Sequence, residues 1–383
     1  MLIAVLKEAK QDETRVALTP DAVKTLTAKG FAVAVESCAG LLSGASDADY
    51  EAAGATISPD RAQLVASADV FPVVNALPTA DQERLKSGSV MIGFLRPLDD
   101  PASLAEAVKR GVTLLSMELV PRISRAQGMD ALSSMATVAG YKAVIVAANH
   151  LHKLFPLLMT AAGTIPPAKV LVLGAGVAGL QAIATARRLG AVVEAYDVRA
   201  AAGEQVKSLG AKFIEVDLGG LQTEDKGGYA KELSPEALEL GRQAIAKAAK
   251  NSDVVITTAQ VPGRRAPLLI RAAAVEEMRA GSIIVDLAAS AGGNCEVTRP
   301  GETFVYHGVT IFGPSNIVAE VPVHASMLYS RNLVNFLQLI LKNGALNIDR
   351  ADEIIAGSCV AFGGEIVNER VAAAAGQDVV RKS

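Results

Sequence analysis

Three glycines join an apolar strand pattern to a helical pattern near the middle of the chain, and this junction constrains the fold more than any other feature. The stretch "KVLVLGAGVAGLQAIATA" (169–186) spaces them as G-x-G-x-x-G. The first glycine permits a tight turn, the second lets a pyrophosphate approach the backbone, and the third lets helix pack close to strand. The phosphates take the free N–H groups at the start of the helix. The pattern predicts a dinucleotide-binding turn with contacts from Gly174, Ala175, Gly176, Val177 and Gly179.

The second strand of this region ends on an acidic residue that bears on the choice of dinucleotide. Asp197 lies eighteen residues after Gly179, where a carboxylate can accept hydrogen bonds from the adenosine ribose hydroxyls. A 2′-phosphate beside it would be repelled by roughly 4 kcal/mol at a separation of about 4 Å and an effective dielectric of about 20. The sequence therefore favours NAD over NADP, unless Arg199 relieves the repulsion instead of lying in a surface loop. The expected contacts also include Val198, Arg199, Thr258 and Ala259.

Short β-rich apolar runs alternate with helical patterns along most of the chain, which predicts the α/β class with two doubly wound parallel sheets. The first third holds "LIAVL", "FAVAVES", "ADVFPVV", "SVMIGFL" and "VTLLSMEL". Six further strand patterns run from "KVLVLG" to "VTIFG", the number in a complete dinucleotide-binding domain. Long helical patterns cover about 131–158 and 324–344.

The chain of 383 residues is too long for one ordinary core, and we expect two domains. Residues 1–135 plus 320–383 are expected to form a discontinuous α/β domain. Residues 136–319 are expected to form a Rossmann NAD(H)-binding domain inserted in it. A cleft crossed by two long helices would then separate the two domains.

Composition excludes several other classes of protein. The net charge of −3, with lysine and arginine scattered singly, offers no basic face for nucleic acid. Three distant cysteines form neither a disulfide framework nor a zinc site, so no metal is expected. The N-terminus lacks a secretion signal. Only residues 170–186 approach the length of a membrane span, and their glycines fit a strand, turn and helix better, so we expect no transmembrane segment.

Two polar loops are candidate sites. "PRISRAQGMDALSS" (121–134) follows a buried strand pattern; its hydrogen-bonding groups of different kinds suit a polar ligand, although loops are also polar because they lie in water. These groups are Arg122, Gln127, Asp130 and Ser133. "DLGGLQTEDKGGYAKEL" (217–233) contains two glycine pairs that can act as hinges, with Tyr229 beside the second. This loop is either a mobile lid over a nucleotide or a disordered insertion.

Three segments resemble the superfamily of alanine dehydrogenases and proton-translocating transhydrogenase α subunits. They are "KEAKQDETRVALTP", "VLGAGVAGLQAIATARRLGAVVEAYD" and "GSIIVDLAASAGGNCE", and the resemblance extends over nearly the whole chain. Leu6 stands where the N-terminal motif usually has proline. Alanine dehydrogenases use an arginine, a lysine, a histidine and an aspartate on the amino acid. Here only Arg15 matches: "FPVVNALP" lacks the lysine, and Arg96 and Ser290 stand at the positions of the histidine and the aspartate.

Hydride transfer between two nicotinamides needs positioning but no general acid or base. The 121–134 loop resembles the transhydrogenase loop that orients the nicotinamide and its ribose, which implies this role for Arg122, Gln127, Asp130 and Ser133. Gly128, where relatives often have serine, is a small departure. "GGYAKEL" resembles the family's mobile loop, which supports Tyr229 as a lid contact.

The resemblance implies the NAD(H)-binding component of a proton-translocating transhydrogenase, a homodimer that passes hydride between NADH and NADP⁺ bound on a partner component. A separate membrane-spanning component would couple this reaction to proton translocation. The chain would be cytoplasmic and peripheral to the inner membrane through its partner subunits, because it ends at Ser383 without apolar spans. Two alternatives stay open: a free-standing NAD-dependent alanine dehydrogenase, and a non-catalytic NAD-sensing or scaffold protein. A sensor would be expected to have lost the polar loop, which is present.

Overall fold

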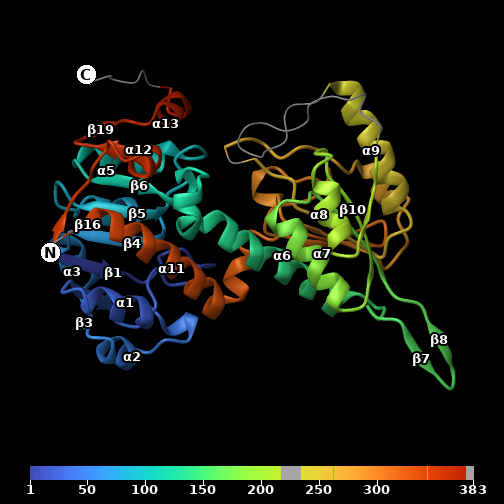
Figure 1. Cartoon of the computed structure of the whole chain (residues 1–383), viewed down its shortest axis with the longest axis horizontal. Coiled ribbons are helices and arrows are strands. Elements are labelled where there is room, and N and C mark those ends of the chain that lie inside the picture. Colours follow the sequence, from blue (N-terminus) through green and yellow to red (C-terminus); the bar gives the residue numbers. More distant parts are fainter. Residues whose placement is uncertain (217–233, 262, 343, 377–383) are drawn as a thin grey trace. The chain divides into compact units, whose positions relative to one another are not determined.

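The computed structural model describes residues 1–216, 234–261, 263–342 and 344–376 (Figure 1). The chain divides into two compact units. Unit 1 comprises Met1–Met135 and Val318–Ser383, and unit 2 comprises Ala136–Ile317. Each unit is built around its own mostly parallel sheet.

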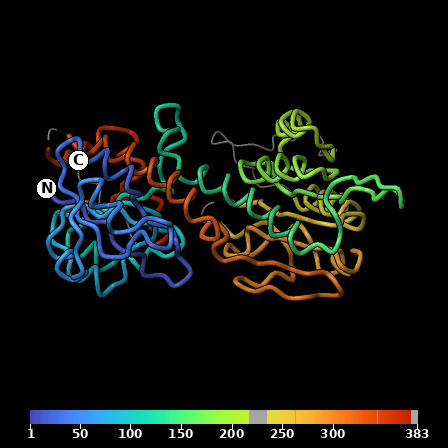
Figure 2. Tube along the Cα trace, turned by 90° about the horizontal axis from the view of Figure 1, so that it is seen from below, coloured from blue at the N-terminus to red at the C-terminus, as the bar shows by residue number. Residues whose placement is uncertain are grey.

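Unit 1 contains an eight-stranded sheet in the order β19-β18-β6-β5-β4-β1-β2-β3. Its strands are β1 (Leu2–Val5), β2 (Ala32–Glu36), β3 (Thr56–Ser58), β4 (Val70–Asn75), β5 (Val90–Phe94), β6 (Thr113–Ser116), β18 (Cys359–Phe362) and β19 (Glu365–Ile366). The first six strands along the chain pair in parallel, while β18 and β19 add an antiparallel edge beside β6. The C-terminal segment therefore completes the sheet begun by the first third of the chain (Figures 1 and 2).

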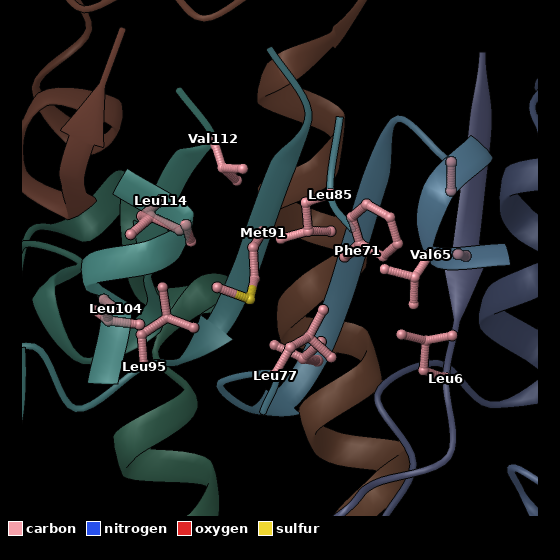
Figure 3. Close-up of a cluster of buried hydrophobic side chains, with 14 of the residues drawn as sticks. Leu6, Val65, Phe71, Leu77, Leu85, Met91, Leu95, Leu104, Val112 and Leu114 are labelled. Carbon is pink, nitrogen blue, oxygen red and sulfur yellow. The ribbon is translucent and has the colours of Figure 1, made fainter. Parts of the chain in front are cut away.

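The helices of unit 1 are short, except for one of nineteen residues. They are α1 (Pro20–Thr27), α2 (Asp47–Ala52), α3 (Arg61–Ser67), α4 (Thr79–Gln82), α5 (Ala105–Lys109), α11 (Pro322–Ile340), α12 (Glu353–Ser358) and α13 (Glu369–Ala374). A small pair, β16 (Leu341–Lys342) and β17 (Ala345–Leu346), follows α11. Figure 3 shows part of the core, where Phe71, Leu85, Met91 and Leu95 lie together, each at most 1% exposed.

Unit 2 contains a seven-stranded sheet in the order β11-β10-β9-β12-β13-β15-β14. Its strands are β9 (Lys169–Leu173), β10 (Val192–Tyr196), β11 (Lys212–Phe213), β12 (Val254–Thr257), β13 (Ile283–Asp286), β14 (Thr303–Tyr306) and β15 (Val309–Phe312). The helices are α6 (Ala131–His150), which begins in unit 1, α7 (Val177–Arg188), α8 (Ala202–Ser208), α9 (Pro235–Ala249) and α10 (Ala272–Glu276). The strand order reverses between β9 and β12, which is where open α/β sheets bind ligands.

The expected α/β class with two doubly wound sheets is confirmed, with three differences in detail. Strand β14 was missed; it pairs antiparallel to β15 through a turn at His307 and Gly308, both with positive φ, as a two-residue hairpin requires. The helix expected over 131–158 ends at His150. The residues after it instead lead into a hairpin of β7 (Leu158–Thr160) and β8 (Gly163–Ile165), because Pro156 disfavours helix before it.

One helix of the described residues, α6, is long and apolar enough to cross a membrane by length and composition alone. Core helices of soluble proteins pass the same test. The stretch 170–186, expected to be the only one of this length, is divided between β9, the glycine turn and α7, as the sequence predicted.

Candidate functional site

The glycine turn of unit 2 has three different environments for its three glycines. Gly174 has φ of 95°, and a Cβ there would lie 2.6 Å from Thr258 Oγ1. A Cβ on Gly179 would lie 1.8 Å from the carbonyl oxygen of Gly174, so the start of α7 packs directly on the turn. A Cβ on Gly176 would meet nothing within 4 Å, which leaves this backbone open to a ligand. These environments fit the three tasks expected from the spacing.

Helix α7 begins at Val177 without a side chain that caps it. Its N-cap, Gly176, makes no side-chain hydrogen bond, and its first turn carries no acidic residue. The N–H groups and positive dipole end of this twelve-residue helix therefore suit an anionic group such as a pyrophosphate. The turn and helix fit a dinucleotide.

Asp197, directly after β10, connects the glycine turn to Arg199. Its Oδ2 accepts a hydrogen bond from the Ala175 backbone N–H at 2.7 Å. Its Oδ1 accepts from Arg199 N at 2.8 Å and Arg199 Nε at 2.9 Å, and Arg199 Nη2 donates to Oδ2 at 2.9 Å. The Arg199 side chain is only 18% exposed. The idea that Arg199 is a mere surface arginine is wrong, because its guanidinium pairs with the carboxylate that was expected to repel a 2′-phosphate.

Thr258 and Ala259 follow β12 at the reversal of strand order. Thr258 Oγ1 donates to the Gly174 carbonyl at 3.1 Å, so this hydroxyl fixes the first glycine of the turn. Ala259 N–H donates to Asn294 Oδ1 at 3.0 Å, and Asn294 Nδ2 donates to Ala259 O and Pro267 O at 2.8 and 2.9 Å. Asn294 is fully buried and clamps the segment after β12.

Asn294 is in turn held by Asp286, the last residue of β13. Asp286 is fully buried, and its two oxygens accept five hydrogen bonds. The donors are Thr257 Oγ1, Ala288 N, Asn294 N, Cys295 N and Thr298 Oγ1. Sequence reasoning missed both Asp286 and Asn294 as positioning residues. They lie within "GSIIVDLAASAGGNCE", whose only signal in the sequence is its resemblance to the family.

The polar loop of unit 1 forms the 3₁₀ helix η4 (Ser124–Met129) followed by the start of α6. Asp130 Oδ1 accepts from Ser133 N at 2.9 Å, and Ser133 Oγ donates to Asp130 Oδ2 at 2.6 Å. This arrangement is that of a helix N-cap, so these two residues have a structural role as well as any in binding. Arg122 and Gln127 are exposed. The structure thus brings together Asp130 and Ser133, and it places all four loop residues in unit 1.

The positions that correspond to an amino-acid site are occupied by an internal network. Arg15 is 7% exposed and donates from Nε and Nη2 to the two oxygens of Glu13 at 2.7 and 2.6 Å. Asn75 Nδ2 bridges Glu8 Oε2 and Glu13 Oε2, each at 3.1 Å. Burial acts to raise the pKa of Glu13, but the hydrogen bonds and charge of Arg15 prevail and lower it. Arg96, by contrast, is exposed.

Glu8 holds the opposite balance. Burial raises its pKa from the ordinary 4.5 to about 7, although hydrogen bonds from Val74 N and Asn75 act to lower it. Within the described residues of the chain, no group of three His, Cys, Asp or Glu side chains can hold a metal. Tyr229 and the glycine pairs of the 217–233 loop lie outside the described residues.

Both models of one protein family match the chain. The N-terminal domain of "Alanine dehydrogenase/PNT" matches residues 4–139, and the C-terminal domain matches residues 143–369. The chain belongs to the alanine dehydrogenase/PNT family. This confirms the resemblance drawn from the three sequence segments.

Members of the alanine dehydrogenase/PNT family resemble this chain to different degrees. An NAD(P) transhydrogenase subunit alpha protein of Rhodospirillum rubrum is 47% identical over 376 residues, which span 96% of this chain and 98% of that protein. Alanine dehydrogenase of Mycobacterium tuberculosis is 30% identical over 379 residues, spanning 97% and 96%. The crystal structure of transhydrogenase from Sinorhizobium meliloti has a TM-score of 0.88 at 42% identity and covers 96% of this chain and 100% of that one. The chain is therefore more similar to these transhydrogenase sequences than to that alanine dehydrogenase.

Proposed function

We propose that this chain is the NAD(H)-binding component of a proton-translocating transhydrogenase, and that it passes a hydride between its NADH and NADP⁺ held on a partner component. The observation that carries the proposal is the Arg15–Glu13 pair. A guanidinium engaged through Nε and Nη2 by its own neighbour is poorly placed to bind a substrate carboxylate. With asparagine at position 75, the site also lacks the lysine on which amino-acid oxidation depends.

The proposed reaction needs no proton donor or acceptor from the chain. The hydride leaves C4 of the reduced nicotinamide with both electrons of its C–H bond and forms the new C–H bond at C4 of the oxidised one. NADH thereby becomes NAD⁺ and NADP⁺ becomes NADPH. The chain contributes binding and orientation, which can supply a large share of the rate because the two rings must meet in one geometry.

The two units are proposed to divide these tasks. Residues 136–319 form the NAD(H)-binding domain, with the glycine turn and α7 on the pyrophosphate and Asp197 on the adenosine ribose. Residues 1–135 with 320–383 form the second domain, whose Arg122, Gln127, Asp130 and Ser133 orient the nicotinamide and its ribose. Tyr229 is proposed to act as a lid contact.

The partners are proposed to be an NADP(H)-binding component, a membrane-spanning component and a second copy of this chain. The β7–β8 hairpin supports the homodimer, because three large apolar side chains on it are exposed: Leu158 by 41%, Met159 by 73% and Ile165 by 40%. Met159→Asp is expected to give monomers in sedimentation velocity runs, whereas a Val305→Asp control on β14 should stay dimeric. A dimeric Met159→Asp variant would remove the hairpin from the interface.

Stopped-flow absorbance tests the reaction itself. The chain is mixed with an NADPH-loaded transhydrogenase partner component and an oxidised NAD analogue whose reduced form absorbs apart from NADPH. A second cuvette holds the chain with NADH, pyruvate and ammonia and no partner. Fast reduction of the analogue that requires both proteins, with no NADH consumed in the second cuvette, is the predicted result. Partner-independent consumption of NADH would instead identify an alanine dehydrogenase.

A further inference from the structure

Two asparagine amides on helix α11 hold a single backbone carbonyl in the polar loop of unit 1. Asn332 Nδ2 donates to Gly128 O at 2.9 Å, and Asn335 Nδ2 donates to the same oxygen at 2.8 Å. Residues three apart lie one above the other on a helix, so both amides face η4 together. A carbonyl oxygen has two lone pairs, and here side-chain amides use both.

The held residue lies within the segment proposed to orient the nicotinamide. Gly128 follows Gln127 directly, and Asp130 N–H donates to Gln127 O at 3.2 Å in the same 3₁₀ turn. A shift of the Gly128 carbonyl therefore moves Gln127 and Asp130 with it. On the near side of the turn, Arg125 donates to both carboxylate oxygens of Asp352, at 2.7 and 2.8 Å, but this pair is partly exposed and contributes little rigidity.

Asn332 is poorly suited to its place if stability is its only task. It is 6% exposed, and its Oδ1 is buried without a hydrogen-bond partner among the described residues. Turning the amide over would not help, because Oδ1 would then face another acceptor, Gly128 O, and Nδ2 would be left unpaired. A buried polar atom without a partner destabilises the fold, whereas an apolar residue of the same shape would avoid that cost.

We propose that Asn332 and Asn335 are positioning residues for hydride transfer, which fix the Gln127–Asp130 segment through the Gly128 carbonyl. This inference rests on the proposed function. The two asparagines act on the rate of transfer and not on the capture of NADH, because the glycine turn and α7, which are proposed to hold the pyrophosphate, lie in unit 2 and are separate from them in the chain.

Three single variants on one helix test the proposal. Asn332→Leu removes one amide and the unpaired Oδ1, and Asn335→Leu removes the other amide from an exposed position. Gln338→Leu is the matched control, since Gln338 is an exposed amide one turn further along α11 with no hydrogen bond to η4 among the described contacts. For each variant we would measure partner-dependent hydride transfer in single turnovers, the Kd for NADH by calorimetry, and the thermal unfolding midpoint.

The proposal predicts that Asn332→Leu slows hydride transfer by about tenfold or more, since misplacement of about 1 Å can cost on the order of a hundredfold. Its Kd for NADH should stay within about threefold of wild type, and its unfolding midpoint should be unchanged or higher because the unpaired oxygen is gone. Asn335→Leu should slow transfer without lowering the midpoint, and Gln338→Leu should change neither. A merely structural Asn332 would instead lower the midpoint and leave the single-turnover rate of the folded protein unchanged.

The outcomes separate this inference from the proposed function. If wild type shows no partner-dependent transfer, the proposed function fails. If wild type transfers hydride and both asparagine variants match its rate, the positioning role is overturned while the function stands. If Asn332→Leu does not fold, Asn335→Leu decides by the same criterion, because its side chain is exposed.

Discussion

The Asp197–Arg199 pair predicts opposite effects of two substitutions on the choice between NADH and NADPH. The guanidinium contacts both oxygens of the carboxylate at 2.9 Å. Arg199→Ala leaves Asp197 bound only to backbone N–H groups, so its negative charge faces a 2′-phosphate without compensation. Asp197→Ala does the reverse, because it frees the guanidinium to pair with that phosphate.

The size of the effect follows from the charge balance. An uncompensated pair of negative charges about 4 Å apart repels by roughly 4 kcal/mol at an effective dielectric of about 20. Because the Arg199 side chain is 18% exposed and Asp197 is 7% exposed, solvent screens part of this repulsion. If about half remains, Arg199→Ala weakens NADPH binding by about 2 kcal/mol, or roughly thirtyfold in Kd. Asp197→Ala should tighten NADPH binding by about tenfold or more.

Calorimetric titration of NADH and NADPH into each variant tests this prediction. Arg188→Ala, at an exposed arginine at the end of α7, is the control for loss of one positive charge. The ratio of the two Kd values should move in opposite directions for Arg199→Ala and Asp197→Ala and should stay constant in the control. A ratio that is unchanged in both variants, or tighter NADPH binding by Arg199→Ala, would refute the role assigned to the pair.

Three further predictions concern the turn, the clamp and the buried carboxyl. Gly176→Ala should keep the wild-type unfolding midpoint but weaken NADH binding in calorimetry by about tenfold or more, whereas Gly174→Ala, at φ of 95°, should lower the midpoint. Asn294→Ala should reduce the free energy of unfolding in urea by about 2–4 kcal/mol, because it leaves buried backbone groups of the segment after β12 unpaired; a loss below about 1 kcal/mol would contradict the clamp. Glu8 binds protons more tightly when folded, so wild type should lose stability relative to Glu8→Met as pH rises from about 4.5 to 7; equal pH dependence of the two would exclude the raised pKa.

Much of the fold was predictable because it follows local periodicity. The strand patterns alternate with helical patterns, and the spacing of Gly174, Gly176 and Gly179 is diagnostic only where a strand precedes and a helix follows. Strand β14 was missed because its two-residue turn contains histidine rather than the usual asparagine or glycine at its first position. The β7–β8 hairpin was missed because its short apolar run could not be distinguished from the helix before it.

The site was only partly predictable, because hydrogen bonds between distant segments leave no periodic signal. The polar loop was found from its composition, but the amides of Asn332 and Asn335 that hold it come from a helix about two hundred residues later in the chain. Asn294 clamps Ala259 for the same kind of reason. Arg199 was left open, since two residues after Asp197 a side chain can point to solvent or back to the carboxylate.

Isotope transfer tests the central claim most directly. NADH carrying deuterium at the transferred position of C4 is mixed with the chain and an NADP⁺-loaded partner component in ordinary water, and the NADPH formed is analysed by mass spectrometry. Direct transfer predicts that every NADPH carries one deuterium and that none exchanges with solvent. NADPH without deuterium would show that the hydrogen comes from solvent, and would contradict an account in which the chain only positions two nicotinamides.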